Sequence, residues 1–484
     1  MAKKFHVLAS VLALSVSVTA LSACGGNNNG GSAAPSGSAS SSASASAGAS
    51  TEKDTITMLL PPVSANYQSK FDQMAADFNA LYPNLTLKIE PAGWEDITQK
   101  LDTQVNAGSP PDIAFIGSDG ISKYMDQGML MDITDSVTPE MLADYDEAPL
   151  NYMKRGDGLY GFPAYMSIQS IGGNKEMLEA AGVDWKNVQQ NGWTFEEFRD
   201  AIKKGTVTEG GKTRYGFVFA VSGVTAKDYL NIMIKNAGMP AAFTQDLKFA
   251  YTSKNYLEVL KGIRQLIDDG SMPKELSSID AGKRWNMFLT GQTMITGKGL
   301  ATFENSAKQN NAKLEAKDAS AVADSIPVEY VVLPMPTFAG QPPVSQAAVD
   351  GYVTFRGKKE PTPEHKANVV KAAYFMASGK VMAETNSELF VGQITKSAKE
   401  AAASLGGDRD PDNMAAVDVL QAHAAPARPD IPADLGAKVI KLEDEVIVPK
   451  FQALLAGETT PEEMYEAVKK AAIEEFGADG VVQD

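Results

Sequence analysis

The stretch AGSPPDIAFIGSDG, residues 107–120, decides the fold class of this chain. Its centre, residues 113–116, is an unbroken apolar run, which is typical of a strand buried on both faces. Glycine and proline before the run mark a loop, and the glycine-containing segment 117–120 follows it. Strands buried on both faces belong to parallel sheets covered by helices, so we expect an α/β protein.

Two further strand and helix pairs precede this stretch. The apolar run at residues 56–60 ends at two prolines and predicts a strand, and the alternating segment 85–89 predicts another. Apolar residues at helical spacing predict helices over 67–81 and 97–105. Ligands of open α/β sheets bind beyond the carboxyl ends of the strands, so we expect a site at loops 61–67, 91–94 and 117–120.

The first residues of the chain have the layout of a secretory signal, with Lys3 and Lys4 before an apolar run. Residues 21–24, LSAC, resemble the lipobox of bacterial lipoproteins, in which the cysteine becomes the lipidated first residue. Cys24 is the only cysteine, and lipidation accounts for an unpaired thiol in an exported protein. We predict a signal peptide at 1–23, then a lipidated Cys24 and a flexible Gly- and Ser-rich tether to residue 53. An ordinary signal peptide with an incidental cysteine is the alternative.

The totals limit the remaining choices. With 484 residues the chain exceeds the usual size of a single core, so two lobes or domains are expected. The formal net charge of -16 disfavours binding to nucleic acid or to anionic membrane surfaces. After the signal segment, no apolar run approaches the length of a membrane span.

Residue types that carry catalysis are sparse. Only His365 and His423 remain after signal removal, neither at metal-ligand spacing, and no G-x-S-x-G motif is present. We therefore predict a protein without enzyme activity, cofactor or metal. A glycoside hydrolase needs only two suitably spaced carboxylates, so a secreted glycosidase stays an alternative.

Six motifs, in order along the chain, resemble the extracellular solute-binding proteins of sugar ABC transporters, the family that includes the maltose-binding proteins. They are FNALYP (78–83), GSPPDI (108–113), LYGFP (159–163), FLTGQTM (288–294), LPMP (333–336) and AGETTPEE (456–463). The resemblance covers about residues 55–476.

This resemblance implies a two-lobed, periplasmic-binding-protein-like α/β fold with a ligand cleft and three hinge crossings between the lobes. On this basis we expect residues 54–165 with 338–394 to form lobe 1, and 166–337 with 395–484 to form lobe 2. The candidate crossings are 163–172, 331–337 and 391–397.

The resemblance also implies a function. A monomeric lipoprotein on the outer face of the cell membrane would capture a carbohydrate, an oligosaccharide in the first place, by closing its lobes. It would then deliver this ligand to an ABC permease. A surface lipoprotein that adheres to carbohydrate is a further alternative.

A sugar has apolar faces and rings of hydroxyl groups, so its site needs aromatic side chains and fixed polar groups. The candidates lie on the predicted loops, at the crossings and in segments that match family positions near ligand: Trp94, Ser118, Asp119, Tyr165, Gly297, Lys298, Asp350, Gly351, Tyr352 and Arg428. Ser118 and Asp119 could instead cap a helix, and Trp94 could pack at a helix start. Lys298 and Arg428 could be solvated, as most such side chains are.

The chain departs from the family after residue 299. The maltose-binding proteins place a stacking tryptophan shortly after this loop, whereas here Leu300, Ala301, Thr302 and Phe303 follow. Stacking is then left to Trp94, Tyr165 or Trp285, and a long linear glucan is disfavoured. Trp285 itself is better explained by helix packing.

Overall fold

The computed structural model describes residues 53–483 apart from 65, 95, 223–224, 300, 339 and 406–408; the side chains of Asp119 and Ser277 are also not described. The predicted signal peptide, Cys24 and the tether lie outside the described residues, except for Lys53. Within the described part of the chain, no helix has both the length and the hydropathy needed to cross a bilayer.

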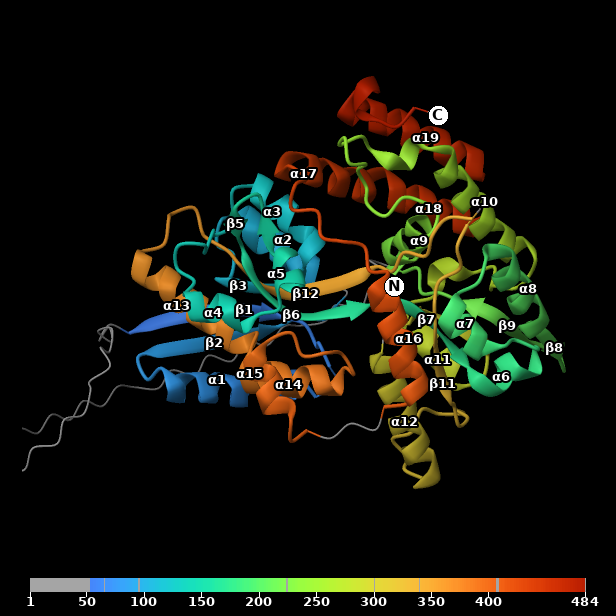
Figure 1. The fold of residues 1–484 in the computed structure, drawn as a ribbon, viewed down its shortest axis with the longest axis horizontal. Coiled ribbons are helices and arrows are strands. Elements are labelled where there is room, and N and C mark those ends of the chain that lie inside the picture. Colours follow the sequence, from blue (N-terminus) through green and yellow to red (C-terminus); the bar gives the residue numbers. More distant parts are fainter. Residues whose placement is uncertain are drawn as a thin grey trace, which may run out of the picture. The chain divides into compact units, whose positions relative to one another are not determined.

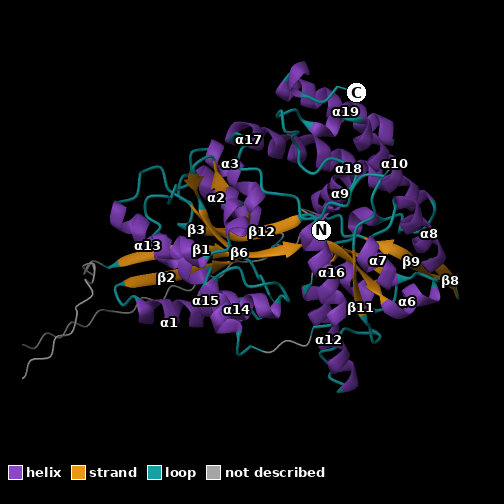
Figure 2. Cartoon of the chain, in the orientation of Figure 1, coloured by secondary structure: helices purple, strands orange, loops and turns teal. Residues whose placement is uncertain are grey.

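The first sheet has five strands in the order β2-β1-β3-β12-β6 (Figure 2). They are β1 (Asp54–Leu60), β2 (Leu85–Pro91), β3 (Ile113–Gly117), β6 (Gly161–Ile168) and β12 (Ala347–Thr354). β1 pairs in parallel with β2 and β3, whereas β12 is antiparallel to β3 and β6. The three strands expected at the start of the chain are therefore confirmed.

The second sheet has the order β11-β7-β10-β9-β8. Its strands are β7 (Ser170–Asn174), β8 (Val207–Glu209), β9 (Lys212–Val218), β10 (Thr293–Gly299) and β11 (Tyr330–Leu333). β10 is parallel to β9 and antiparallel to β7, and β8 and β9 form a hairpin. A small separate hairpin consists of β4 (Lys154–Arg155) and β5 (Gly158–Leu159).

Each sheet has its own hydrophobic core, so the chain forms two α/β lobes, as the fold-class prediction requires. The helices of the first lobe are α1 (Phe71–Leu81), α2 (Ile97–Ala107), α3 (Ile121–Asp126), α4 (Pro139–Asp144), α5 (Glu147–Asn151), α13 (Pro363–Met376), α14 (Gly379–Glu388) and α15 (Lys396–Ala402). The helices that follow in the second lobe and at its edges are α6 (Lys175–Ala180), α7 (Trp185–Asn191), α8 (Phe195–Gly205), α9 (Thr225–Lys235), α10 (Lys254–Asp268), α11 (Ala281–Leu289), α12 (Thr302–Glu315), α16 (Pro411–Ala422), α17 (Ala433–Leu442), α18 (Val448–Ala456) and α19 (Pro461–Phe476) (Figure 1).

Short helical turns complete the chain. They are η1 (Gln68–Lys70), η2 (Ser118–Gly120), η3 (Ala250–Thr252), η4 (Leu276–Ser278), η6 (Ala478–Gly480) and the π-helical η5 (Glu443–Ile447). η2 directly follows β3, which explains why the glycine-containing end of the opening stretch turns back at once.

The chain passes from the first sheet to the second at Gln169, between β6 and β7, and returns between β11 and β12. It leaves the first lobe for the last time later than the expected residue 394. Ile394 is buried in the first core as expected, but Ala398 beyond it is buried there too, so α15 stays with that lobe. α17, although late in the chain, packs along α3 of the first lobe (Figure 1).

Two helices of the second lobe begin with capping boxes. Thr194 Oγ1 accepts from the Glu197 amide at 3.2 Å, and the Glu197 carboxylate accepts from the Thr194 amide at 2.8 Å. Thr460 and Glu463 make the same exchange at the start of α19. Each box satisfies two amides that would otherwise have no partner within the helix.

Candidate functional site

Aromatic side chains gather at the carboxyl end of the first sheet around Phe115 of β3. The ring of Phe115 lies 5.3 Å from that of Tyr352, and 6.2 Å from those of both Trp94 and Tyr165. Phe115 itself is buried. Phe115, which the sequence predicted only as part of a buried strand, therefore brings together three candidate residues: Trp94, Tyr165 and Tyr352.

Tyr165 and Asp350 form a polar pair in this group. The Tyr165 hydroxyl donates to Asp350 Oδ2 at 2.5 Å. Burial and the neighbouring Asp350 carboxylate raise the pKa of Tyr165 well above its usual value, so the phenol keeps its proton and stays a donor. Asp350 lies opposite Gly117 in the β12–β3 ladder, which places it beside the end of β3 where Ser118 follows.

Ser118 is held through its backbone. Arg155 of β4 donates from its guanidinium to the Ser118 carbonyl at 2.5 Å and to Ser122 Oγ at 2.9 Å. Ser118 is the first residue of η2 and is half-buried, and the N-cap position before it is Gly117. Arg155 thus fixes the turn without using the hydroxyl that the sequence proposed as a sugar contact. The side chain of the neighbouring Asp119 is among those not described.

Trp94 links two of the predicted loops. Its indole Nε1 donates to the Pro62 carbonyl at 3.0 Å, while 39% of the residue stays exposed. The hydrogen bond fixes the indole, and the exposed part leaves an aromatic surface that a ligand can reach.

Gly351 and Tyr352 lie inside the first lobe. Tyr352 is 2% exposed, and its hydroxyl shares a hydrogen bond of 2.5 Å with the hydroxyl of Tyr67, which is also buried. A Cβ atom on Gly351 would come within 2.3 Å of the Phe162 carbonyl oxygen, so only glycine fits between the paired strands. Both residues support the sheet in this structure.

At the carboxyl end of β10, Gly297 and Lys298 form the second-lobe part of the candidate site. Lys298 Nζ donates to Asp228 Oδ2 at 2.5 Å, and both side chains are largely buried. Arg284 of α11 donates to the carbonyls of Gly297 and Lys298. Arg284 is only 3% exposed, and burial lowers its pKa to about 10, so it remains charged at neutral pH.

The position where the family has a stacking tryptophan is occupied by an aromatic stack of a different kind. The Phe303 ring at the start of α12 lies 4.8 Å from Trp285 and 4.9 Å from the Arg284 guanidinium carbon. Trp285 also stacks on Phe288 at 5.4 Å. Trp285 therefore packs between helices, as its sequence context indicated.

Arg428 is separate from both groups. Its guanidinium pairs with Asp430 at 2.8 Å and donates to the carbonyls of Phe243 and Thr244. Among the described residues, it makes no hydrogen bond or ion pair with another candidate. In this structure Arg428 ties the loop before α17 to the second lobe.

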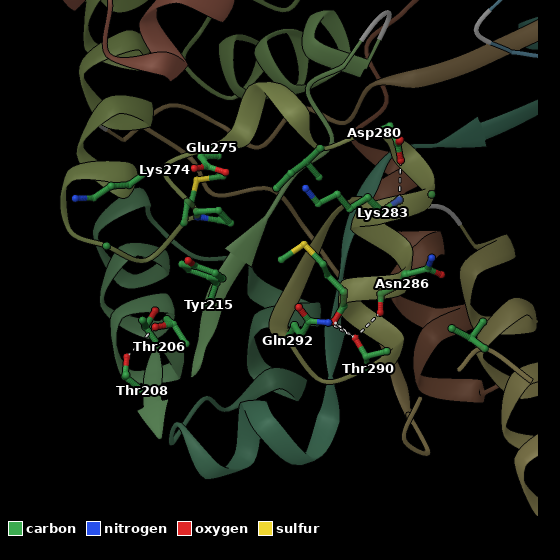
Figure 3. Close-up of a pocket in the computed structure, with 18 of the residues that line it drawn as sticks. Thr206, Thr208, Tyr215, Lys274, Glu275, Asp280, Lys283, Asn286, Thr290 and Gln292 are labelled. Carbon is green, nitrogen blue, oxygen red and sulfur yellow. Dashed lines mark hydrogen bonds between the residues drawn. The ribbon is translucent and has the colours of Figure 1, made fainter. Parts of the chain in front are cut away.

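A groove of about 1120 Å³ lies elsewhere on the second lobe (Figure 3). One wall carries Thr206, Thr208 and Tyr215 of the β8–β9 region, and Gln292 and Thr290 lie across from them at the end of α11. No candidate residue from the sequence lines this groove, so it is a different surface feature from the two groups above.

The comparisons with known proteins decide the family. Residues 62–382 match the model of the bacterial extracellular solute-binding proteins. The chain belongs to this family. A protein of Brucella abortus named as a binding protein is 25% identical to this solute-binding protein over 255 residues. That match spans 52% of this chain and only 60% of the relative's length.

Solved structures share the two-lobed fold. An ABC substrate-binding protein of Listeria monocytogenes in complex with cycloalternan is 19% identical, with a TM-score of 0.67 over 88% of this chain and 100% of its own. A maltose/maltodextrin-binding domain of Bdellovibrio bacteriovorus bound to maltotriose is 16% identical, with a TM-score of 0.65 over 87% of this chain and 99% of its own. At this identity the likeness establishes the fold of the solute-binding protein.

Sequence reasoning missed the residues that hold these groups in place. Phe115, Arg155 and Arg284 were not singled out, because a buried aromatic and two arginines carry no motif of their own. The only available signals were that Phe115 directly precedes the end of a strand and that Arg284 adjoins Trp285. Neither signal distinguishes these residues from ordinary core or surface positions.

Proposed function

We propose that this solute-binding protein captures a carbohydrate, an oligosaccharide in the first place, by closing its lobes, and delivers it to an ABC permease. The observation that carries the proposal is the group at the carboxyl ends of β1, β2 and β3. There, the partly exposed Trp94 and the buried Tyr165 both pack on Phe115, and the Tyr165 hydroxyl donates to the Asp350 carboxylate. An aromatic surface for apolar sugar faces and a fixed acceptor for hydroxyl groups are the two requirements of a sugar site.

The second lobe supplies groups of complementary chemistry. Lys298, near the end of β10, is a donor, and its backbone carbonyl accepts from Arg284. Contacts from both lobes to one ligand stabilise a closed state, because the ligand then binds that state more tightly than the open one. Two structures of similar fold were solved with cycloalternan and with maltotriose, which favours a sugar over other solutes.

A thermal-shift screen tests the proposal. The chain without residues 1–23 is heated with maltotriose, cycloalternan, monosaccharides, and, as controls, a peptide and an amino acid. A sugar present at 100 times its dissociation constant should stabilise the fold by about 2.7 kcal/mol. Stabilisation by a peptide or amino acid, with none by any sugar, would contradict the carbohydrate assignment.

The same incubations separate binding from hydrolysis. We expect the stabilising sugar to be recovered intact by chromatography after prolonged incubation. Release of shorter sugars would instead favour a secreted glycoside hydrolase. Retention on an immobilised polysaccharide, with no stabilisation by soluble sugars, would favour an adhesion protein.

A further inference from the structure

Glu388, the last residue of α14, holds the loop that follows β1. Its Oε1 accepts from the amide of Asn66 at 3.1 Å and from Asn66 Nδ2 at 3.0 Å. Its Oε2 accepts from Ser64 Oγ at 3.0 Å. Hydrogen bonds to a charged acceptor are the stronger ones, so this carboxylate is a main restraint on a loop predicted to face the ligand.

The backbone of the same residue contacts the second lobe. Asn305 Nδ2 of α12 donates to the Glu388 carbonyl at 2.9 Å. The last four carbonyls of a helix have no partner within it, so the end of α14 presents acceptors to a neighbour. α12 starts just after the Gly297–Gly299 end of β10, and its Ala307 is buried against residues of the second sheet. Glu388 therefore contacts the loop after β1 in one lobe and α12 in the other.

The chain just after Glu388 is held in a costly conformation. Phe390 has a φ of 56°, in the left-handed region that bulky side chains avoid. Its ring is buried, and the Arg409 guanidinium carbon lies 5.7 Å from the ring centroid. Such backbone strain persists only where the surroundings fix it, so the end of α14 is held by tertiary contacts.

We propose that Glu388 is a positioning residue that couples the order of loop 62–67 to the approach of the two lobes. When Asn305 engages the carbonyl, the end of α14 is fixed, and the carboxylate is then fixed against Ser64 and Asn66. When the lobes separate, this restraint is lost and the loop loosens. The use of this loop for ligand rests on the proposed function, whereas the coupling itself does not.

Two substitutions separate the contact of the Glu388 carboxylate with the loop from the contact of its carbonyl with Asn305. Glu388→Gln keeps the carbonyl that Asn305 uses but replaces the charged acceptor of the loop. Asn305→Ala removes the contact between the lobes and leaves the carboxylate intact. Ser306→Ala is the matched control, because Ser306 lies on the same helix and its hydroxyl bonds only within it, to the Thr302 carbonyl at 3.1 Å.

Amide hydrogen exchange of the full chain from residue 24, without ligand, is the measurement. We expect both Glu388→Gln and Asn305→Ala to speed exchange in a peptide covering residues 62–67 about five-fold, the factor that follows from losing one ordinary hydrogen bond. Ser306→Ala should leave that peptide unchanged. Unchanged melting temperatures would show that the variants are folded.

The outcomes decide the proposal. If Asn305→Ala changes exchange only near α12 and α14, the carboxylate acts locally and the coupling is overturned. If Glu388→Gln leaves loop 62–67 unchanged, the positioning role is overturned as well. Because no sugar is used, a failure of every sugar to bind would refute the proposed function without affecting this result.

Discussion

His365 lies between two carboxylates at the amino ends of β1 and β3, two inner strands of the first sheet. Its Nδ1 is 2.9 Å from Asp54 Oδ2, and its Nε2 is 3.1 Å from Asp112 Oδ1. The hydrogen bond to Asp112 and then that to Asp54 raise the pKa of His365 to about 9, against the opposing effect of burial. A doubly hydrogen-bonded, charged histidine thus joins α13 to the starts of β1 and β3.

This arrangement predicts a pH-dependent contribution to stability. Because the pKa is raised in the folded state, the contribution is complete below the unfolded value of 6.5 and is lost as the pH rises towards 9. His365→Gln should lower the free energy of unfolding by roughly 2 kcal/mol at pH 6 and by much less at pH 9.5. Urea unfolding of both proteins at the two pH values measures this. A deficit that is equal at both pH values would show that His365 contributes packing rather than charge.

Trp94 offers a test of the sugar site itself. Replacing it with alanine removes an exposed aromatic surface and one hydrogen bond, so we expect a sugar identified by thermal shift to bind about ten-fold more weakly. Stability should change little, since the side chain is partly exposed. Calorimetric titration measures the affinity. Leu81→Ala is the control, because Leu81 is 60% exposed at the end of α1, and it should bind normally. Equal affinities of the unchanged protein, Trp94→Ala and Leu81→Ala would exclude stacking on Trp94.

At the scale of elements, each capping box stabilises its own helix start through local hydrogen bonds. Thr194→Ala removes the side-chain acceptor at the start of α8 and should destabilise the protein by about 1 kcal/mol. Thr103→Ala is a suitable comparison, because Thr103 lies inside α2 and its hydroxyl only bonds back to Gln99. The denaturant midpoint of Thr194→Ala should therefore be lower than that of Thr103→Ala. A midpoint of Thr194→Ala equal to that of the unchanged protein would contradict the role of the capping box.

The elements were predictable to different degrees. β3 could be predicted because burial on both faces leaves an apolar run in the sequence. The start of α19 also has a local pattern, since Thr460, Pro461 and Glu463 lie within four residues. The last passage between the lobes was placed too early. Residues 391–397 have a composition that fits an extended hinge, but the burial of Ile394 and Ala398 depends on contacts with the first core. No local pattern contains that information.

At the scale of the molecule, the predicted anchor has its own test. We expect the full chain to be found with the membrane fraction and Cys24→Ser to be released, because the cysteine is the predicted lipid attachment site. Fractionation of cells that express the two forms measures this. The affinity for the sugar should be the same in both, since Cys24 precedes the described lobes; membrane retention of the serine variant would overturn the anchor prediction.

The sequence alone determined the α/β class and the order of the early strands along the chain, because these depend on residues within a few positions of one another. The tertiary structure alone decided which residues of the opening stretch matter and how. Phe115 became the centre of an aromatic group, and Asp112 a partner of His365 253 residues away. Glu388 reaches Asn66 across 322 residues. Contacts of this kind are set by the packing of the two sheets, and a single sequence carries no local pattern that specifies them.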